Sequence, residues 1–241
     1  MEQIALLGDI HGNLPALAAA FDDIKSRGIR RLWNLGDMCG GGPEGAKAVD
    51  WCREHCEVNL MGNWEDFLLY RSDHPKAQKY ITELGEERYA YLHTLPLSHK
   101  VWMSGRRLHL FHGRPLREGI LWSEDPPEVK REMFHILPDE YPPQIVGYAD
   151  IHRQFKYDFQ DEEKCLFNTG SIGNSFSGSY ACYAILHGVP DSKTPGIFSI
   201  EFVTVPYDVE EAVARAKEQS EWFDCEAYIR GLRTGSWQQI G

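Results

Sequence analysis

Several features that mark whole classes of protein are missing from this chain of 241 residues. No internal repeats or low-complexity tracts interrupt it. No apolar run approaches the ~18 residues that a transmembrane helix needs. The opening MEQIALLGD reads as a strand almost at once, which leaves no room for the basic and apolar regions of a signal sequence. We therefore expect a cytoplasmic protein.

Cysteine is present at six positions, 39, 52, 56, 165, 182 and 225, but in no pattern that indicates a disulfide framework. None of these positions shows paired Cys-x-x-Cys spacing. Cys52 and Cys56 lie four residues apart on one face of a predicted helix. Two small buried thiols are more common in that arrangement than a zinc site. The cysteines are therefore expected to be reduced and without a metal role.

Positive charge is scarce as well. Lysine and arginine together number 25 against 36 acidic residues, so the formal net charge is −11. Duplex nucleic acid and anionic membranes attract proteins that carry a basic footprint, and neither is expected as the main partner. A polyanionic substrate would have to be neutralised locally, within one site.

The chain does contain five short acidic and histidine motifs, each placed after an apolar run. In chain order they are GDIHGN at 8–13, GD at 36–37, GNWED at 62–66, HG at 112–113 and DIH at 150–152. A strand followed by Gly-Asp is common in α/β proteins, so no single motif identifies a site. Together they supply seven potential metal ligands: Asp9, His11, Asp37, Asn63, His112, Asp150 and His152.

The apolar runs explain how such distant residues can meet. QIALL, RLWNL and VNLM each read as a short buried strand that ends at a glycine. In an open α/β sheet the carboxyl ends of parallel strands share one edge, and the loops leaving that edge converge. A mixed set of Asp, Asn and His favours transition metals, first Mn or Fe, with Zn or Ni as alternatives. Two such ions, about 3.5 to 4 Å apart, are a recurring solution for phosphoester hydrolysis.

These motifs and their order resemble the calcineurin-like metallophosphoesterase superfamily, and within it the small bacterial and archaeal branch related to YfcE-type phosphodiesterases. The family pattern runs DxH, GDxx, GNHD or GNHE, a histidine after a later strand, and GHxH. Each part has a counterpart here, and FNTGSIG at 167–173 resembles the family's NPGSVG segment. The resemblance covers roughly residues 3–187 and implies a hydrolase of phosphoesters that binds two metal ions.

Carried over by position, the resemblance implies two metal sites that share one ligand. Asp37 would bridge the two ions and fix their spacing. Asp9, Asp37 and Asn63 would be the catalytic side chains. The first ion would be held by Asp9, His11 and His152, and the second by Asn63, His112 and Asp150.

One departure from the family pattern lies at Asp150, where GHxH has its first histidine. The sequence ADIH is followed by RQF and matches the family's HTHRQF form if Ala149 takes the glycine position. A second register aligns Gly147 with that glycine. Tyr148 and Asp150 then replace both histidines, and His152 drops out. We favour the first register, because it keeps a metal-binding residue at both positions and makes the second site harder and more anionic.

A second departure lies at Trp64, where the family usually has a histidine that protonates the leaving group. An indole does not titrate near neutrality, so Trp64 cannot act as a general acid. Proton donation contributes roughly 10²- to 10⁴-fold and matters most for a basic alkoxide leaving group. A phosphoanhydride needs less help, since its leaving group is a phosphate. The sequence thus favours a nucleoside polyphosphate, and the GNW variant resembles a diadenosine tetraphosphate hydrolase subgroup of this superfamily.

Other residues are candidates for substrate contact. Trp64 could stack on a nucleobase, a contact worth ~1 to 3 kcal/mol in single-stranded nucleic-acid binders. Packing beside the metals is an equally good interpretation of this indole. Arg114, Arg117 and Arg153 are candidates for bidentate phosphate contact, although each is equally well explained as surface charge. Arg153 is favoured, because it follows His152 directly.

The predicted function is hydrolysis of a phosphoester or phosphoanhydride bond in a small phosphorylated or nucleotide substrate, most favourably a dinucleoside polyphosphate. A cyclic-nucleotide or general phosphodiesterase is the first alternative among enzymes, and a protein phosphatase is the second. A non-catalytic binding scaffold that keeps the fold is the alternative from another class, prompted by the departures at Trp64 and Asp150. Six of the seven ligand positions keep the family identity, which favours an enzyme.

Alternating strands and helices followed by consecutive strands predict an α/β (α+β) fold, with two mixed sheets packed face to face and helices outside. With 42% apolar residues the chain can form a substantial core, so we expect a single domain over 1–241. The segment 114–143 is rich in proline and has a charged middle. Because it follows His112, it is predicted to form a cap insertion beside the site.

Local signals place the individual elements. Asn13 and Pro15 mark the start of a helix over about 14–27, and a polar helical stretch covers roughly 76–94. Two strands, HKVWM and RLHLFH, follow it. A closing helical region spans about 208–230. The runs QIVGYA, CLFNT, SYACYAILH and GIFSIEFVTV are predicted to build the second sheet.

Overall fold

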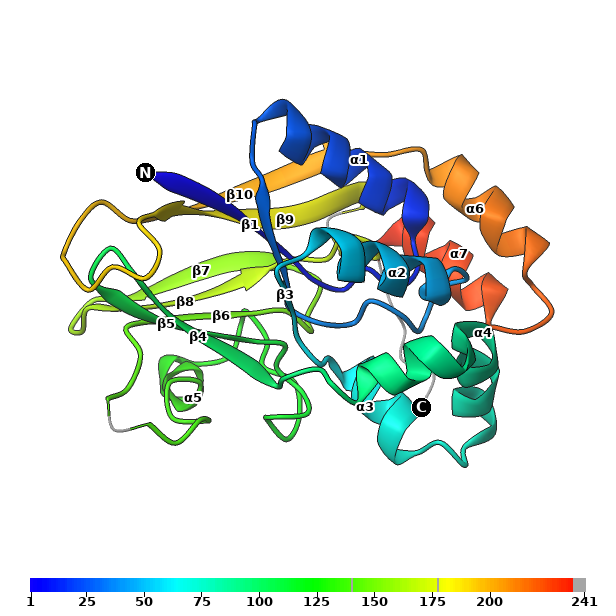
Figure 1. The fold of residues 1–241 in the computed structure, drawn as a ribbon, viewed down its shortest axis with the longest axis horizontal. Helices are drawn as coiled ribbons and strands as arrows, with labels where there is room; N and C mark the ends of the chain where they lie inside the picture. The colour runs from blue at the N-terminus through cyan, green and yellow to red at the C-terminus, as the bar shows by residue number, and fades with distance from the viewer. Residues whose placement is uncertain (140, 177, 236–241) are drawn as a thin grey trace.

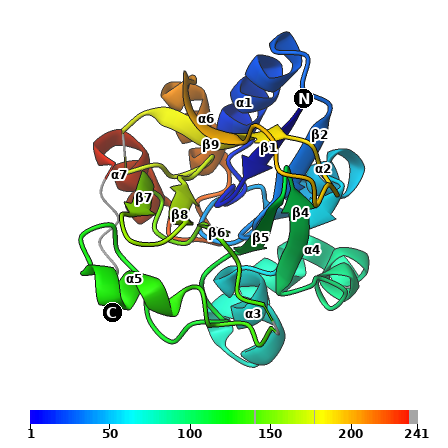
Figure 2. The same ribbon diagram turned by 90° about the vertical axis from the view of Figure 1, so that its left-hand side faces the viewer.

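Two five-stranded sheets packed face to face form the centre of the molecule (Figures 1 and 2). The structure, a computed structural model, describes residues 1–139, 141–176 and 178–235. Most of the helices lie outside the sandwich, as Figure 2 shows. The predicted fold class, two mixed sheets with helices outside, is therefore confirmed. Within the described part of the chain, no helix is long and apolar enough to cross a membrane.

The first sheet combines parallel and antiparallel pairing. In spatial order its strands are β10 (Ser199–Pro206), β9 (Tyr180–Gly188), β1 (Glu2–Leu7), β2 (Arg31–Asn34) and β3 (Val58–Asn59). β1, β2 and β3 run parallel, whereas β9 is antiparallel to both β1 and β10. The carboxyl ends of the three parallel strands therefore share one edge.

The second sheet has a similar plan. Its strands, in spatial order, are β4 (Ser98–Met103), β5 (Arg106–Phe111), β6 (Ile145–Tyr148), β8 (Lys164–Thr169) and β7 (Gln154–Phe159). β5, β6 and β8 run parallel, and β4 and β7 close the two edges in antiparallel orientation. Each sheet thus contains three parallel strands whose carboxyl ends can supply residues to one site.

The assignment of the later strands to the second sheet is wrong for β9 and β10. Both belong to the first sheet, where β9 pairs with β1 through Ile4 with Leu186 and Leu6 with Ala184. Residues 181–186 are all buried, which suits a strand in the interior of a sheet. β7, which the sequence analysis does not identify, lies at an edge and has a mixed exposed and buried pattern.

The helices follow their local signals closely. At the start of α1, the Asn13 side chain accepts a hydrogen bond from the Ala16 N–H (3.2 Å), as predicted for a cap. The predicted polar helix is kinked at Gly85, which has a positive φ of 73°. The closing helical region is divided into two helices. The helices are α1 (Leu14–Ser26), α2 (Gly45–His55), α3 (Asn63–Tyr70), α4 (Pro75–Leu92), α5 (Pro127–Glu132), α6 (Val209–Glu218) and α7 (Cys225–Thr234).

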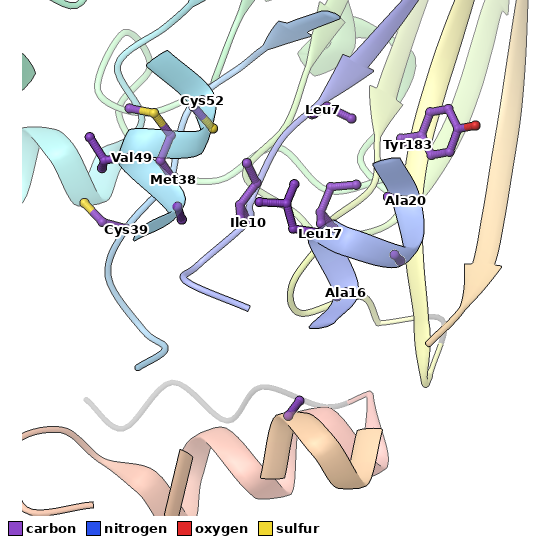
Figure 3. Close-up of a cluster of buried hydrophobic side chains, with 14 of the residues drawn as sticks. Leu7, Ile10, Ala16, Leu17, Ala20, Met38, Cys39, Val49, Cys52 and Tyr183 are labelled. Atoms are coloured by element: carbon purple, nitrogen blue, oxygen red, sulfur yellow. The ribbon is translucent and has the colours of Figure 1, made fainter. Parts of the chain in front are cut away.

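Alternation along β1 connects two of the buried clusters. Ile4 and Leu6 lie in the cluster between the sheets, whereas Ala5 and Leu7 lie in the cluster under the helices. This is the period of two expected for a strand buried on both faces. Figure 3 shows part of the cluster under the helices, with Leu7 of β1, Leu17 of α1 and Tyr183 of β9 among its labelled side chains.

A third buried cluster connects the segment 114–143 to the second sheet. Leu121, Met133 and Phe134 of this segment lie in one cluster with Tyr148 and Leu166 of β6 and β8. Full burial of one such side chain stabilises the fold by roughly 1.5 to 3 kcal/mol. The segment therefore covers the outer face of the second sheet. A single domain over 1–241 and a cap role for this segment stay predictions.

Candidate metal centre

The predicted ligands follow strands of both sheets. In the first sheet, the chain leaving β1, β2 and β3 supplies four of them. In the second sheet, the chain leaving β5 and β6 supplies the other three. In order along the chain, they are Asp9 and His11 after β1, Asp37 after β2, Asn63 after β3, His112 after β5, and Asp150 and His152 after β6.

One group of potential ligands joins the two sheets through Asp9, His11 and His152. One ligand atom from each lies within 4.8 Å of the others. The His152 Nε2 atom is 3.3 Å from Asp9 Oδ1, and the His11 Nε2 atom is 3.7 Å from it. The two Nε2 atoms are 3.1 Å apart. This is the set that the favoured register predicts, and it includes His152.

A second group consists of Asp9, Asp37 and His112. The His112 Nε2 atom lies 3.4 Å from Asp37 Oδ2 and 3.7 Å from Asp9 Oδ1. The Asn63 amide is beside this group, with Oδ1 3.0 Å from His112 Nε2. Asp37 Oδ2 also approaches His11 Nε2 at 3.8 Å. The carboxylates of Asp9 and Asp37 therefore both face both groups. The sequence prediction gives the bridging role to Asp37 alone.

All three histidines are oriented by hydrogen bonds from their Nδ1 atoms to backbone carbonyls. The acceptors are Gly40 for His11 (2.9 Å), Leu35 for His112 (3.0 Å) and Asn174 for His152 (2.8 Å). A carbonyl oxygen only accepts, so each Nδ1 carries a proton. In the neutral rings the Nε2 lone pairs then point into the centre, which is the arrangement of metal-ligating histidines.

Asp9 gives a direct test of whether a cation fits. Its Oδ1 atom is buried and has no hydrogen-bond partner among the described residues, although several imidazoles surround it. Burial raises the pKa of Asp9, but His152 and His112 lower it more, to about 2. Burial lowers the pKa of His112, but Asp37 and Asp9 raise it more, to about 10. The ionised carboxylates therefore favour positive charge at this point, and the Asp, Asn and His donors fit transition-metal ions.

The backbone at the centre adopts an uncommon conformation. Positive φ angles occur at Asp9 (52°), His11 (50°), Asp37 (54°), Asp150 (74°) and His152 (56°). Residues other than glycine rarely adopt this left-handed region, and each instance costs on the order of 1 kcal/mol or more. Such strain is typical of functional sites. Glycine would relieve it, but glycine has no side chain to point into the site.

Glu65 supports the centre, and the sequence analysis does not assign it a role. It is fully buried and accepts hydrogen bonds from the backbone N–H groups of Asp37 (2.8 Å), Met38 (2.9 Å) and Gly62 (2.9 Å). One carboxylate therefore ties the loop after β2 to the loop after β3. The signal was present, because Glu65 occupies the last position of the family's GNHE motif.

The turn after β8 supports the centre from the other sheet. The Ser171 hydroxyl donates to the Asp9 carbonyl (2.8 Å) and accepts from the Asn174 N–H (2.8 Å). The Asn174 carbonyl in turn accepts from His152. This turn therefore holds the chain around two ligand residues.

Trp64 lies beside the centre with its ring half-buried. Its backbone N–H donates to Asp37 Oδ1 (2.8 Å), and its ring centroid is 6.4 Å from that of His11. The ring packs edge-on against Tyr80, with centroids 5.2 Å apart, and the Lys76 Nζ atom lies 4.6 Å above it. A Cβ atom at Gly40 would come within 2.2 Å of the indole. Packing therefore surrounds much of this side chain.

Asp150 lies outside both ligand groups and is paired with Arg114. The Arg114 Nη2 atom donates to Asp150 Oδ1 (2.6 Å), and Nε lies 3.0 Å from Oδ2 and 3.1 Å from Oδ1. The Arg114 backbone N–H contacts Oδ2 at 3.3 Å. The Asp150 backbone N–H donates to Asp9 Oδ2 (3.1 Å). The residue thus contacts the centre through its backbone while its carboxylate faces an arginine.

The other predicted arginines have partners at the surface. Arg153 is exposed and forms an ion pair with Glu124. The Arg117 Nη2 atom lies 3.6 Å from Glu132 Oε2. Phosphate contact by Arg114, Arg117 and Arg153 stays a prediction. Of the three, Arg114 is the one whose side chain is hydrogen-bonded to Asp150.

Comparisons with known proteins give the family and the fold. The model of a family described as calcineurin-like phosphoesterase matches residues 3–174. An uncharacterized protein of Methanocaldococcus jannaschii is 28% identical over 237 residues, covering 87% of this chain and 89% of that protein. The fold is similar to a metallophosphoesterase structure from Sphaerobacter thermophilus, with a TM-score of 0.74 and 19% identity over 98% of this chain and 99% of that one. A hypothetical protein from Pyrococcus horikoshii gives a TM-score of 0.73 and 20% identity over 99% and 100%.

Proposed function

The chain belongs to the calcineurin-like phosphoesterase family and is a metal-dependent phosphoesterase, and from this premise we propose that it cleaves phosphoanhydride bonds in nucleotides. Dinucleoside polyphosphates are the favoured substrate class. The observation that carries the proposal is Trp64, which stands beside the centre at the position of the family's proton donor. A leaving group that is itself a phosphate needs little protonation, so its departure tolerates an indole there.

The site residues have separate roles in this proposal. Asp9, His11 and His152 would hold one ion and His112 and Asn63 the other, with the carboxylates of Asp9 and Asp37 available to both. When bound, such ions act as Lewis acids and lower the pKa of a water molecule. Asp37 accepts the Trp64 N–H at Oδ1, which leaves its Oδ2 atom facing the histidines.

Local positive charge supports a polyanionic substrate on this acidic chain. Arg114 is charged and about a third exposed, and it lies beside Asp150 at the centre. Lys76 lies above the Trp64 ring. Guanidinium groups bind phosphate oxygens in a bidentate manner, whereas an ammonium group acts as a point charge. These two side chains can therefore neutralise phosphates that extend beyond the metal ions.

A general or cyclic-nucleotide phosphodiesterase is the second candidate. The general phosphodiesterase is favoured by the packing of Trp64, because Gly40 and Lys76 both approach the ring on which a nucleobase would stack. A substrate without a base would not need that platform. A general phosphodiester therefore differs from the dinucleoside polyphosphate in whether a base contributes to binding. A cyclic nucleotide differs from it in the bond that is cleaved, a phosphoester in place of a phosphoanhydride.

A substrate panel tests the proposal. The manganese-loaded protein would be assayed with diadenosine tetraphosphate, cyclic AMP, bis-p-nitrophenyl phosphate and a phosphopeptide. We expect kcat/KM for the dinucleoside polyphosphate to exceed the others by about tenfold or more, as expected when polar groups of a site are matched by the substrate. A higher kcat/KM for the aryl diester or the cyclic nucleotide would establish the second candidate instead.

A further inference from the structure

The Asp150 carboxylate is hydrogen-bonded to the Arg114 side chain. Both of its oxygens accept from Arg114, and its side chain is only 3% exposed. Among the described residues, neither group of potential metal ligands includes Asp150. A carboxylate in a bidentate pair with a guanidinium is already neutralised and oriented. To ligate an ion, Asp150 would have to leave Arg114.

We propose that Asp150 is a positioning residue that holds the Arg114 guanidinium at the metal centre, where Arg114 binds a phosphate group of the substrate. In this inference Asp150 is not a metal ligand, although it occupies a ligand position of the family pattern. The inference rests on the proposed function only in so far as the substrate carries a phosphate.

Local geometry supports the pair. Arg114 follows His112 by two residues, so its position is tied to a ligand of the second group. Gly113 lies between them with a positive φ of 135°, and a Cβ atom there would come within 2.9 Å of Asp150 Oδ2. Only glycine leaves room for the carboxylate at this point while adopting that backbone conformation.

The Arg114 guanidinium keeps free donors and an exposed surface for an anion. An arginine side chain is not deprotonated in proteins, so the Arg114 guanidinium is charged. Its side chain is 31% exposed, so a ligand can reach it from solvent. The Nη1 atom takes no part in the pair with Asp150. Because a guanidinium carries five N–H donors, the pair leaves donors for a phosphate oxygen.

Metal binding separates the two roles of Asp150. We would titrate Mn²⁺ into metal-free protein by calorimetry and compare the parent with Asp150→Asn. The variant should still bind both ions, each with an affinity within about threefold of the parent, because the Asp150 carboxylate contacts Arg114 and the backbone N–H that donates to Asp9 is kept. Loss of a metal ligand, or of a contact that orients one, would cost ~10-fold or more. Loss of one ion, or a weakening of about tenfold or more, would overturn the inference. Binding of the ion at His11 and His152 reports in the same titration that the variant is folded.

Phosphate binding tests the second step. Inorganic phosphate would be titrated into the manganese-loaded parent, Arg114→Gln, Asp150→Asn and the double variant. Each single change should weaken phosphate by about tenfold or more, the range of a charge-assisted hydrogen bond, and the double variant should be no weaker than Arg114→Gln. Phosphate affinity within about threefold of the parent in Arg114→Gln, or additive losses in the double variant, would contradict the inference.

Arg131→Gln is the matched control. Arg131 also pairs with a carboxylate, Glu162 (2.8 Å), and its side chain is 38% exposed. Glu162 precedes β8, so this pair lies at the end of the sheet opposite the metal centre. Its loss should change neither titration. Both titrations use Mn²⁺ and inorganic phosphate alone, so failure to cleave nucleotides would reject the proposed function and leave the role of Arg114 standing.

Discussion

The two halves of the metal centre differ in how closely they keep the family pattern. In the first half, Asp9, His11 and His152 bring their ligand atoms within 4.8 Å of one another. In the second half, His112 and Asn63 keep their places, but Asp150 faces Arg114 and a tryptophan follows Asn63. Both departures therefore affect one half. The comparison teaches that a ligand inventory alone does not describe a binuclear site, since an acidic residue at a ligand position can serve an arginine.

The largest effect on activity is expected from the loss of a carboxylate that faces both halves of the metal centre. Asp9 belongs to both ligand groups. Asp9→Asn, or Asp37→Asn, should lower kcat by roughly 10³-fold or more, because a carboxylate facing both ions is lost. Turnover of bis-p-nitrophenyl phosphate measures this, and circular dichroism melting should show little unfolding. Activity within about tenfold of the parent would rule out the assigned centre.

Removing one histidine ligand from each half in turn should show whether each half binds its own metal ion. His152→Ala is expected to lower bound manganese from about two equivalents to about one, and His112→Ala to do the same at the other half. Elemental analysis after dialysis gives both numbers. If His112→Ala retained two equivalents, the second half would not be a metal site. Chelation of the parent should abolish turnover, and manganese should restore it.

A smaller effect is expected from restoring the family residue at Trp64. Trp64→His introduces a titratable donor and should raise kcat on a phenyl phosphodiester by about tenfold or more. The gain on the p-nitrophenyl diester should be smaller, since its leaving group is less basic. Trp64→Phe is the control, because it keeps an aromatic ring without an acid. A gain below about twofold on the phenyl ester would refute the idea that Trp64 replaces a lost acid.

The smallest effect is a change in stability with pH that comes from Glu83, a carboxylate outside both halves of the metal centre. It shows how a carboxylate that binds no metal behaves. Glu83 accepts from the Ala46 N–H at the start of α2 (2.8 Å), and burial raises its pKa from 4.5 to about 7. The folded state therefore binds the proton more tightly than the unfolded chain. This contribution to stability is fully present below pH 4.5 and is lost as the pH rises through 7.

Urea unfolding of the metal-free parent and of Glu83→Gln checks this effect. Relative to the variant, the parent should lose on the order of 1 kcal/mol between pH 4.5 and 7. Using metal-free protein removes the contribution of metal binding. An equal pH dependence in both proteins would show that Glu83 does not titrate in this window.

The sequence predicts what local signals determine. Asn13 marks the start of α1, and a glycine with a polar residue after an apolar run marks the strand ends that carry His11 and Asp37. Sheet membership of β9 depends instead on pairing with β1, which lies near the other end of the chain. No local pattern records such a choice, because β9 is buried on both faces in either sheet.

The contacts that modify the site are also long-range. Arg114 and Asp150 are 36 residues apart, and their pairing depends on the adjacency of β5 and β6. Glu65, in α3 after β3, accepts from the Asp37 N–H in the loop after β2, and this contact depends on the pairing of β2 with β3. The charged residues can be read from the sequence, but which of them pair becomes apparent only when the strands are placed side by side.

The left-handed turns that present Asp9, Asp37 and His152 have a consequence for how this protein changes over generations. At most positions glycine weakens a fold, but at these turns it relieves strain and removes the functional group at once. A lineage that no longer needs hydrolysis would therefore gain stability by accepting glycine there. At these turns the side chains that bind metal and the backbone that is most relaxed therefore place opposite demands on the same residues.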